Sequence, residues 1–357
     1  MIQEDYLIFT PGPVKMSQEI LEIGAKQTPY FRNQEFSDVL LECETSLLKM
    51  LNAPHGSRIV FLTASGTAGM EATVMNLLTQ DDCALIVNGG GFGQRFVDIS
   101  KSYSIRHKEV KPYNTNLANI EDTISANDCN TFIVNAHETS IGLLYDLDAI
   151  GKFCAKYDLL NIVDAISMFV TDPLDMQTQN IDVAIISSQK GLALPPGLTM
   201  VALTPKAINK LQPIKSHYFN FKNYLRDGER GQTPYTPAVS IILQLQARLK
   251  QIEYLGGIQA TNEKSKEIAQ YFREQLAQFP LEFYTKFMPN AMTALVPKDS
   301  FKAKEIVAIV EDKYKIVLCP NGGDLADKVF RVSHMGEITT SDINLLLSAL
   351  KKLYQNN

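Results

Sequence analysis

The fold is indicated most directly by the segment Ile185-Ile186-Ser187-Ser188-Gln189-Lys190-Gly191-Leu192-Ala193-Leu194-Pro195-Pro196-Gly197. Lys190 follows an apolar run that is typical of a buried strand, and a turn rich in glycine and proline comes next. Ligands of open α/β sheets bind at the carboxyl ends of the strands. A lysine that loses water at such a place has a lowered pKa and becomes a nucleophile. The alternative from this segment alone is a surface lysine in a loop.

The first 240 residues alternate short apolar runs with helical patterns. The predicted strands are Ile59–Leu62, Cys83–Val87, Ile105–Val110, Thr131–Asn135, Asn161–Val163, Val183–Ser187 and Thr199–Leu203. Helices are expected from an N-cap at Ser37, over Gly66–Leu78 and over Leu147–Tyr157. Strands that alternate with helices indicate βαβ units and a mostly parallel sheet covered by helices.

The pattern changes near Pro237. Helices are predicted at Val239–Tyr254, Asn262–Phe279, Lys302–Tyr314 and Asp342–Tyr354, and strands at Met292–Val296 and Val329–Ser333. We therefore expect an α/β protein with an N-terminal arm over residues 1–16, a large domain over 17–250 and a smaller C-terminal α/β domain over 251–357.

Composition excludes several classes of protein. The chain has 357 residues with 34 basic and 39 acidic side chains, so bulk electrostatics do not favour nucleic acid or an anionic membrane as a partner. It contains no run of 18 apolar residues, and the N-terminus MIQEDYLIF lacks the basic flank of a signal peptide. The five cysteines and five histidines are scattered, which favours a reducing, cytoplasmic location and argues against a metal centre.

Two glycine-containing segments are candidates for binding phosphate. Asn88–Gly93 does not fit G-x-G-x-x-G in either register, and no G-x-x-x-x-G-K-[ST] sequence occurs. Thr63-Ala64-Ser65-Gly66-Thr67 follows a predicted strand and opens a helix. Unpaired backbone N–H groups and the helix dipole at such a terminus bind phosphate. An ordinary N-cap is the alternative.

Asp164 stands at the end of another predicted strand, in Asn161-Ile162-Val163-Asp164-Ala165. Together with Lys190 it suggests pyridoxal 5′-phosphate (PLP), which needs a lysine for its Schiff base and an acid near its ring nitrogen. The segment Ser65–Thr67 offers a phosphate cup, and Phe92 offers a flat group against the ring.

Eight motifs in order carry a resemblance to a known family. They are Thr10–Pro13, Ala64–Ala72, Asn88-Gly89 with Phe92–Arg95, His137–Ser140 with Gly142, Val163–Ala165, Ser188–Lys190 with Pro195–Leu198, Thr233–Val239, and Phe330–Gly336. The chain resembles the class V aminotransferases of PLP-dependent transferase fold type I. Within them it is most similar to the alanine–glyoxylate and serine–pyruvate aminotransferases.

The resemblance implies the roles of individual residues. Lys190 would carry the Schiff base and move the proton at the substrate Cα, and Asp164 would pair with the pyridine nitrogen. The implied cofactor-binding residues are Ser65, Gly66, Thr67, Phe92, Thr139, Asp164, Gln189, Lys190, Thr233, Tyr235 and Thr236. Thr236, with Tyr235 or Thr233, would reach the phosphate of the other subunit of a homodimer.

The same resemblance implies a substrate pocket. Arg331 would grip the substrate carboxylate as a bidentate fork, and Gly12 would keep the N-terminal strand close to the substrate. Arg32 lies in an N-terminal segment that departs from the family pattern, since Phe31 stands where many relatives have histidine. Ile141 and the pair Val332-Ser333 also depart from the usual motifs.

These residues imply a ping-pong transaminase that moves an amino group between alanine or serine and glyoxylate or pyruvate. No second arginine stands in a motif where a distal carboxylate would bind, which disfavours aspartate and glutamate as donors. A 2-aminoethylphosphonate–pyruvate transaminase, or a related phosphonate or amino-alcohol aminotransferase, is the alternative, with Arg32 and Lys15 near the N-terminal motif. A cysteine desulfurase that uses Cys319 and a non-enzymatic scaffold are two further alternatives.

Overall fold

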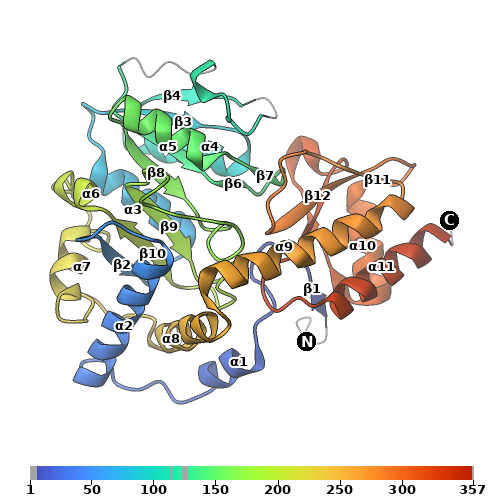
Figure 1. The fold of residues 1–357 in the computed structure, drawn as a ribbon, viewed down its shortest axis with the longest axis horizontal. Helices are drawn as coiled ribbons and strands as arrows, with labels where there is room; N and C mark the ends of the chain where they lie inside the picture. Colours follow the sequence, from blue (N-terminus) through green and yellow to red (C-terminus); the bar gives the residue numbers. More distant parts are fainter. Residues whose placement is uncertain (1–5, 113–114, 123–127, 356–357) are drawn as a thin grey trace.

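The computed structural model describes residues 6–112, 115–122 and 128–355 (Figure 1). The first five residues of the expected N-terminal arm lie outside the described residues. In the part of the chain that is described, no helix is long and apolar enough to cross a membrane.

A seven-stranded sheet forms the centre of the first part of the chain. Its strands are β2 (Arg58–Leu62), β3 (Cys83–Val87), β4 (Arg106–Val110), β5 (Thr131–Asn135), β8 (Leu160–Asp164), β9 (Val183–Ser187) and β10 (Thr199–Leu203). The strand order is β2-β10-β9-β8-β5-β3-β4. Only β10 runs antiparallel to its neighbours, and the other pairs are parallel. The mostly parallel sheet predicted from the apolar runs is therefore confirmed, with strand ends within one residue.

Helices cover both faces of this sheet, because successive strand residues point to opposite sides. Ile59 and Phe61 of β2 belong to one core cluster, whereas Val60 and Leu62 belong to another. The first face is covered by α2 (Gln34–Met50), α5 (Leu147–Lys156) and α8 (Val239–Tyr254). The second is covered by α3 (Gly66–Leu77), α4 (Gly91–Ser102) and α7 (Phe221–Gly228).

The start of α2 differs from the sequence prediction. The helix begins at Gln34, and the side chain of Asn33 caps it by accepting a hydrogen bond from the Phe36 amide at 2.9 Å. Ser37 is not the N-cap. It is buried inside the first turns, where its hydroxyl accepts a hydrogen bond from Gln232 at 2.8 Å. Asparagine caps helices as well as serine does, so the sequence offered two candidates.

The C-terminal part of the chain builds an antiparallel sheet of its own. Its strands, in the order β11-β12-β15-β14, are Leu281–Phe283, Met292–Pro297, Phe330–Ser333 and Cys319–Pro320. The helices α9 (Gly257–Gln275), α10 (Ala303–Tyr314) and α11 (Thr340–Gln355) pack on it around one apolar cluster. Gly256 has a φ of +102°, and α9 begins directly after it, five residues earlier than predicted.

The N-terminal segment returns to this C-terminal part (Figure 1). Strand β1 (Leu7–Ile8) pairs in parallel with β13 (Ile316–Val317), and Phe9 is buried in the C-terminal cluster. The remaining elements are α1 (Gln18–Gly24), α6 (Pro205–Asn209), the hairpin β6 (His137–Glu138) and β7 (Leu143–Leu144), and three 3₁₀ turns at Ile120–Asp122, Leu276–Gln278 and Gly323–Leu325. The domain boundaries at 16/17 and 250/251 stay a prediction.

Candidate active site

A cavity of about 270 Å³ lies at the carboxyl ends of the parallel strands. Neighbouring strands β5, β8 and β9 end at the same edge of the sheet, so the residues that follow them meet there. Eight of the residues predicted from sequence line the cavity: Ser65, Gly66, Thr67, Phe92, Thr139, Asp164, Gln189 and Lys190. Met70, Arg95, His137, Ile166 and Ser167 complete the lining.

Lys190 stands in the connection between β9 and β10. The Ser188 amide donates to Leu198 O at 3.0 Å and the Ser188 hydroxyl donates to Pro195 O at 2.6 Å, which closes the loop around the lysine. The ammonium nitrogen donates to the carbonyl of Pro11. Burial lowers the pKa of Lys190 to about 8, although the nearby Asp164 carboxylate opposes this shift. The side chain therefore has a larger neutral, nucleophilic fraction near neutral pH than an exposed lysine has.

Gly12 lies directly against this lysine. A Cβ atom added to Gly12 would stand 2.7 Å from Cδ and 2.9 Å from Nζ of Lys190. The φ of Gly12 is +118°, a conformation that residues with a side chain rarely adopt. Both observations require glycine at this position.

Asp164 ends β8, the strand next to the one that leads to Lys190. Its Oδ1 accepts a hydrogen bond from the Ile166 amide at 2.9 Å, and Oδ2 has no hydrogen-bond partner among the described residues. Burial raises the pKa of Asp164 to about 6. A buried carboxylate with an unused oxygen suits a protonated ring nitrogen, since such a donor supplies the missing partner.

The segment from Ser65 to Thr67 forms the N-terminus of α3. Ser65 is the N-cap residue, and its side chain makes no capping hydrogen bond. The first N–H groups of the helix therefore stay available for an anion. A Cβ on Gly66 would lie 2.6 Å from Ile166 Cδ1, so a larger residue would crowd the cavity wall. This terminus fits a phosphate group.

Glu138 holds the loop that carries Phe92, and its role was not predicted. The buried carboxylate accepts hydrogen bonds from the amides of Phe92 at 3.3 Å and Gly93 at 3.0 Å, and from the hydroxyl of Ser140. A Cβ on Gly90 would lie 2.8 Å from Glu138 Cγ. The acid therefore caps the N-terminus of α4 and fixes the position of Phe92 at the cavity.

Arg95 was also missed as a site residue, although it stands in one of the motifs that carry the resemblance. Its Nη1 donates to Thr67 Oγ1 at 3.0 Å, and its guanidinium lies 4.8 Å from the centre of the Phe92 ring. The signal in the sequence was the spacing of three residues from Phe92, which places both side chains on one face of α4.

Arg331 approaches from the C-terminal sheet, where it belongs to β15. It donates from Nη1 to Thr139 O at 3.0 Å and from Nη2 to Pro320 O at 2.6 Å, while Nε is buried without a hydrogen-bond partner. Arg331 does not itself line the 270 Å³ cavity, but its charge contributes to lowering the pKa of Lys190. The orphaned Nε fits an incoming carboxylate.

Four predicted residues lie apart from this cavity within one chain. Arg32 donates to Thr233 O at 2.7 Å, and the Tyr235 hydroxyl donates to His217 O at 2.6 Å. Thr236 lines a separate open depression on the surface. The cavity lining includes none of the four residues Arg32, Thr233, Tyr235 and Thr236.

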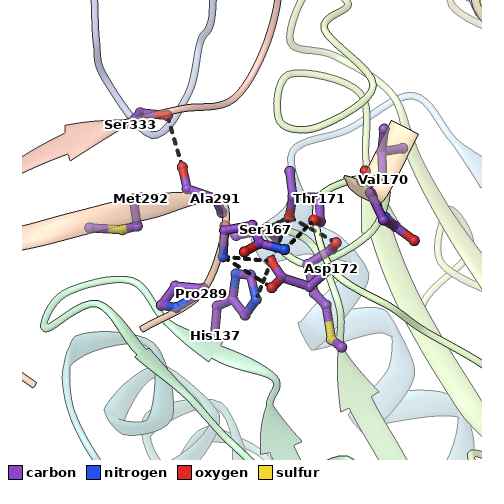
Figure 2. A network of polar contacts seen from close by, with 12 residues as sticks. His137, Ser167, Val170, Thr171, Asp172, Pro289, Ala291, Met292 and Ser333 are labelled. Carbon is purple, nitrogen blue, oxygen red and sulfur yellow. Dashed lines mark hydrogen bonds and ion pairs between the residues drawn. The ribbon is translucent and has the colours of Figure 1, made fainter. Parts of the chain in front are cut away.

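A buried polar network, drawn in Figure 2, adjoins the cavity through His137. His137 lines the cavity, and its Nε2 stands 3.2 Å from Asp172 Oδ2, an ion-pair distance without hydrogen-bond geometry. Asp172 also accepts hydrogen bonds from the Thr171 hydroxyl at 3.0 Å and from the Asn290 amide at 3.0 and 3.1 Å. This network connects the cavity wall to the loop that precedes β12. This network was not predictable from the sequence, because His137, Asp172 and Asn290 are far apart in the chain.

Comparison with known proteins decides the family. Residues 24–344 match the family model for aminotransferase class V. The chain belongs to the class V aminotransferases. An uncharacterized aminotransferase of Helicobacter pylori (strain J99) is 30% identical over 352 residues, which cover 97% of this chain and 93% of that protein. An alanine–glyoxylate aminotransferase of Oryctolagus cuniculus is 25% identical over 366 residues, which cover 98% of this chain and 93% of that one.

The architecture agrees with this assignment. The solved aspartate aminotransferase from Thermus thermophilus superimposes with a TM-score of 0.89 at 24% identity, covering 97% of this chain and 99% of that one. The fold is that of the PLP-dependent aminotransferases of fold type I, as predicted. Among the described residues, no group of three or more His, Cys, Asp or Glu side chains is placed to hold a metal ion.

Proposed function

We propose that this class V aminotransferase uses PLP to move an amino group between a small amino acid and a small 2-oxo acid. The observation that carries the proposal is the meeting of Lys190 and Asp164, from adjacent strands, in one cavity with the open N-terminus of α3. When bound, PLP supplies an electron sink for the charge that develops at the substrate Cα.

The protein's own groups divide the remaining work. Lys190 supplies a neutral amine, first as nucleophile and then as the base that moves the proton at the substrate Cα. Asp164 holds a proton at the ring nitrogen, and the amides of Ser65–Thr67 bind phosphate. Phe92, fixed by Glu138, packs against a ring face. Arg331 binds the α-carboxylate of both substrates in turn.

We propose alanine or serine as donor and glyoxylate or pyruvate as acceptor. The alanine–glyoxylate relative supports this choice, while the aspartate aminotransferase has the same fold. Arg95 is a second arginine in the cavity, but its position beside Thr67 and Phe92 favours the phosphate end rather than a distal substrate carboxylate.

The alternatives have less support from the structure. The phosphonate alternative relied on Arg32 and Lys15, but Arg32 is engaged with Thr233 and Lys15 pairs with Asp342 at 3.0 Å. A desulfurase needs a reactive thiolate. Burial raises the pKa of Cys319, which disfavours that form.

We further propose a homodimer in which Thr236, with Tyr235 or Thr233, contacts the phosphate of the partner's site. The open depression that contains Thr236 is lined by residues 28–31 and 236–241, and Tyr30 there is 70% exposed. Such an exposed apolar surface suits a subunit interface. Sedimentation should give a dimer, and an active monomer at micromolar concentration would contradict this. We place the enzyme in the cytoplasm, in keeping with its five free cysteines.

The test of the function compares half-reactions of the purified PLP form. Alanine, serine, aspartate and 2-aminoethylphosphonate are added separately, and the cofactor absorbance is followed. We expect fast conversion with alanine or serine and none in the Lys190→Ala variant. Fast conversion by 2-aminoethylphosphonate with little by alanine or serine would instead establish the phosphonate function.

A further inference from the structure

A second cavity, of about 220 Å³, lies between loops of the large-sheet part of the chain, helices α8 and α9, and the segment that follows β15. We name it the junction cavity. Its lining comes from three places: Val170, Thr171 and Gly191 beside the large sheet, residues of α8 and α9 with Leu255 between them, and His334 with Gly336–Ile338 after β15. Its lining shares no residue with the lining of the active-site cavity, so the two cavities are distinct.

Two buried side chains in its lining have hydrogen-bond donors without partners. Arg248 is 6% exposed. Its Nη1 is bonded to Glu337 at 2.9 Å and to Gln251 at 3.2 Å, whereas Nε is buried without a partner and Nη2 has no hydrogen bond among the described residues. An arginine buried in this way is costly unless an acceptor satisfies it.

His334 is the second such side chain, and its neighbours define its tautomer. Arg273 Nε donates to Thr293 Oγ1 at 3.0 Å, and the same hydroxyl lies 2.9 Å from His334 Nε2. Thr293 Oγ1 accepts from the arginine, and among the described residues His334 Nε2 is the one acceptor within reach of its own proton, so the ring proton is left on Nδ1. Burial lowers the pKa of His334, so the ring is neutral. Its Nδ1–H is thus a buried donor without a partner.

The charges and walls of the junction cavity define the ligand class. Arg248 and Lys264 bring two positive charges and Glu337 one negative charge, so the lining suits a monoanion. Val170, Leu255, Ile268 and Ile338 make the remaining wall apolar. We propose that the junction cavity binds a short-chain aliphatic monocarboxylate, with its carboxylate at Arg248 and His334 and its alkyl chain against the apolar wall.

The position of the cavity connects it to the active site. Thr171 lines the junction cavity, and the next residue, Asp172, belongs to the network that reaches His137 (Figure 2). Val170, also in the lining, is β-branched with a φ of +79° and is held by a hydrogen bond from Asn262 at 2.8 Å. Backbone strain of this kind persists only where the surrounding structure enforces it.

Calorimetric titration of the PLP-loaded protein with 3-methylbutanoate tests the proposal. The Arg331→Gln variant serves as the background, because it removes the proposed carboxylate grip of the active site. Binding should persist in this background and weaken at least about tenfold when Arg248→Gln is added, since a charge-assisted contact is lost. Two comparison ligands should each bind at least about tenfold more weakly. One is 3-methylbutanamide, which lacks the charge, and the other is inorganic phosphate, which carries more negative charge and has no alkyl chain.

A matched pair of surface variants keeps the test independent of folding. Ala260 lies exposed in the first turn of α9 and lines the cavity, whereas its exposed neighbour Gln259 does not. Ala260→Trp should abolish binding and Gln259→Trp should leave it unchanged. Loss of binding in Arg331→Gln alone, equal binding of phosphate, or binding insensitive to Ala260→Trp would each overturn the proposal. Since binding is measured directly, these outcomes do not depend on the transaminase activity.

Discussion

Replacing Gly12 by alanine tests whether the N-terminal segment positions the reactive lysine. The new Cβ would stand 2.7 Å from Lys190 Cδ, and ordinary contact begins at 3.4 Å, so the lysine chain must move by about 0.7 Å. Displacements near 1 Å in an active site can cost about a hundredfold in rate. We therefore expect kcat to fall by about ten- to a hundredfold.

The backbone strain of this substitution needs a control. Gly257 also has a positive φ, +85°, but a Cβ there would meet nothing within 4 Å. Gly257→Ala should therefore cost about 1–2 kcal/mol of stability from strain alone and leave kcat unchanged. Steady-state kinetics and thermal melts of both variants separate the two effects. Normal kcat in Gly12→Ala, or an equal loss in Gly257→Ala, would refute the contact between Gly12 and Lys190 as the cause.

Three further predictions concern the site. Asp164→Asn should lower kcat by several orders of magnitude with a melting temperature close to that of the wild type, because a neutral amide does not favour a protonated ring nitrogen; near-normal kcat would rule out this electrostatic role. Arg331→Lys should raise KM about ten- to a hundredfold for both donor and acceptor, since a bidentate pair worth about 1.5–3 kcal/mol is lost; an effect on one substrate only would contradict a shared pocket. Uptake of PLP by cofactor-free enzyme should speed up as pH rises and level off above about 8, the lowered pKa of Lys190, because only the neutral amine attacks; a plateau first reached above pH 10 would contradict the effect of burial.

The large sheet was predictable because local composition and long-range packing agree. Cys83–Val87 is apolar throughout, Val183–Ser187 is apolar up to its last residue, and both are fully buried, so their sequences alone indicate the strands. The meeting of Asp164 with Lys190 follows from the same logic, since parallel strands that end at one edge bring their following residues together.

Contacts between distant segments were not predictable. The pairing of His137 with Asp172, the cap that Glu138 provides for α4, and the short strands β1, β11 and β14 depend on neighbours that the sequence does not place. Short strands have too few residues for a periodic signal. A buried carboxylate cannot be recognised from the sequence, because groups that donate hydrogen bonds to it come from distant segments.

The proposed transaminase chemistry is tested most directly by finding the lysine that carries the cofactor. Borohydride reduction of the PLP form fixes the bond, and peptide mapping then identifies the labelled residue. We predict label on Lys190, with Lys190→Ala remaining unlabelled at the same cofactor concentration. Label on another lysine, or none on the wild-type protein, would contradict the assignment of this cavity as the active site.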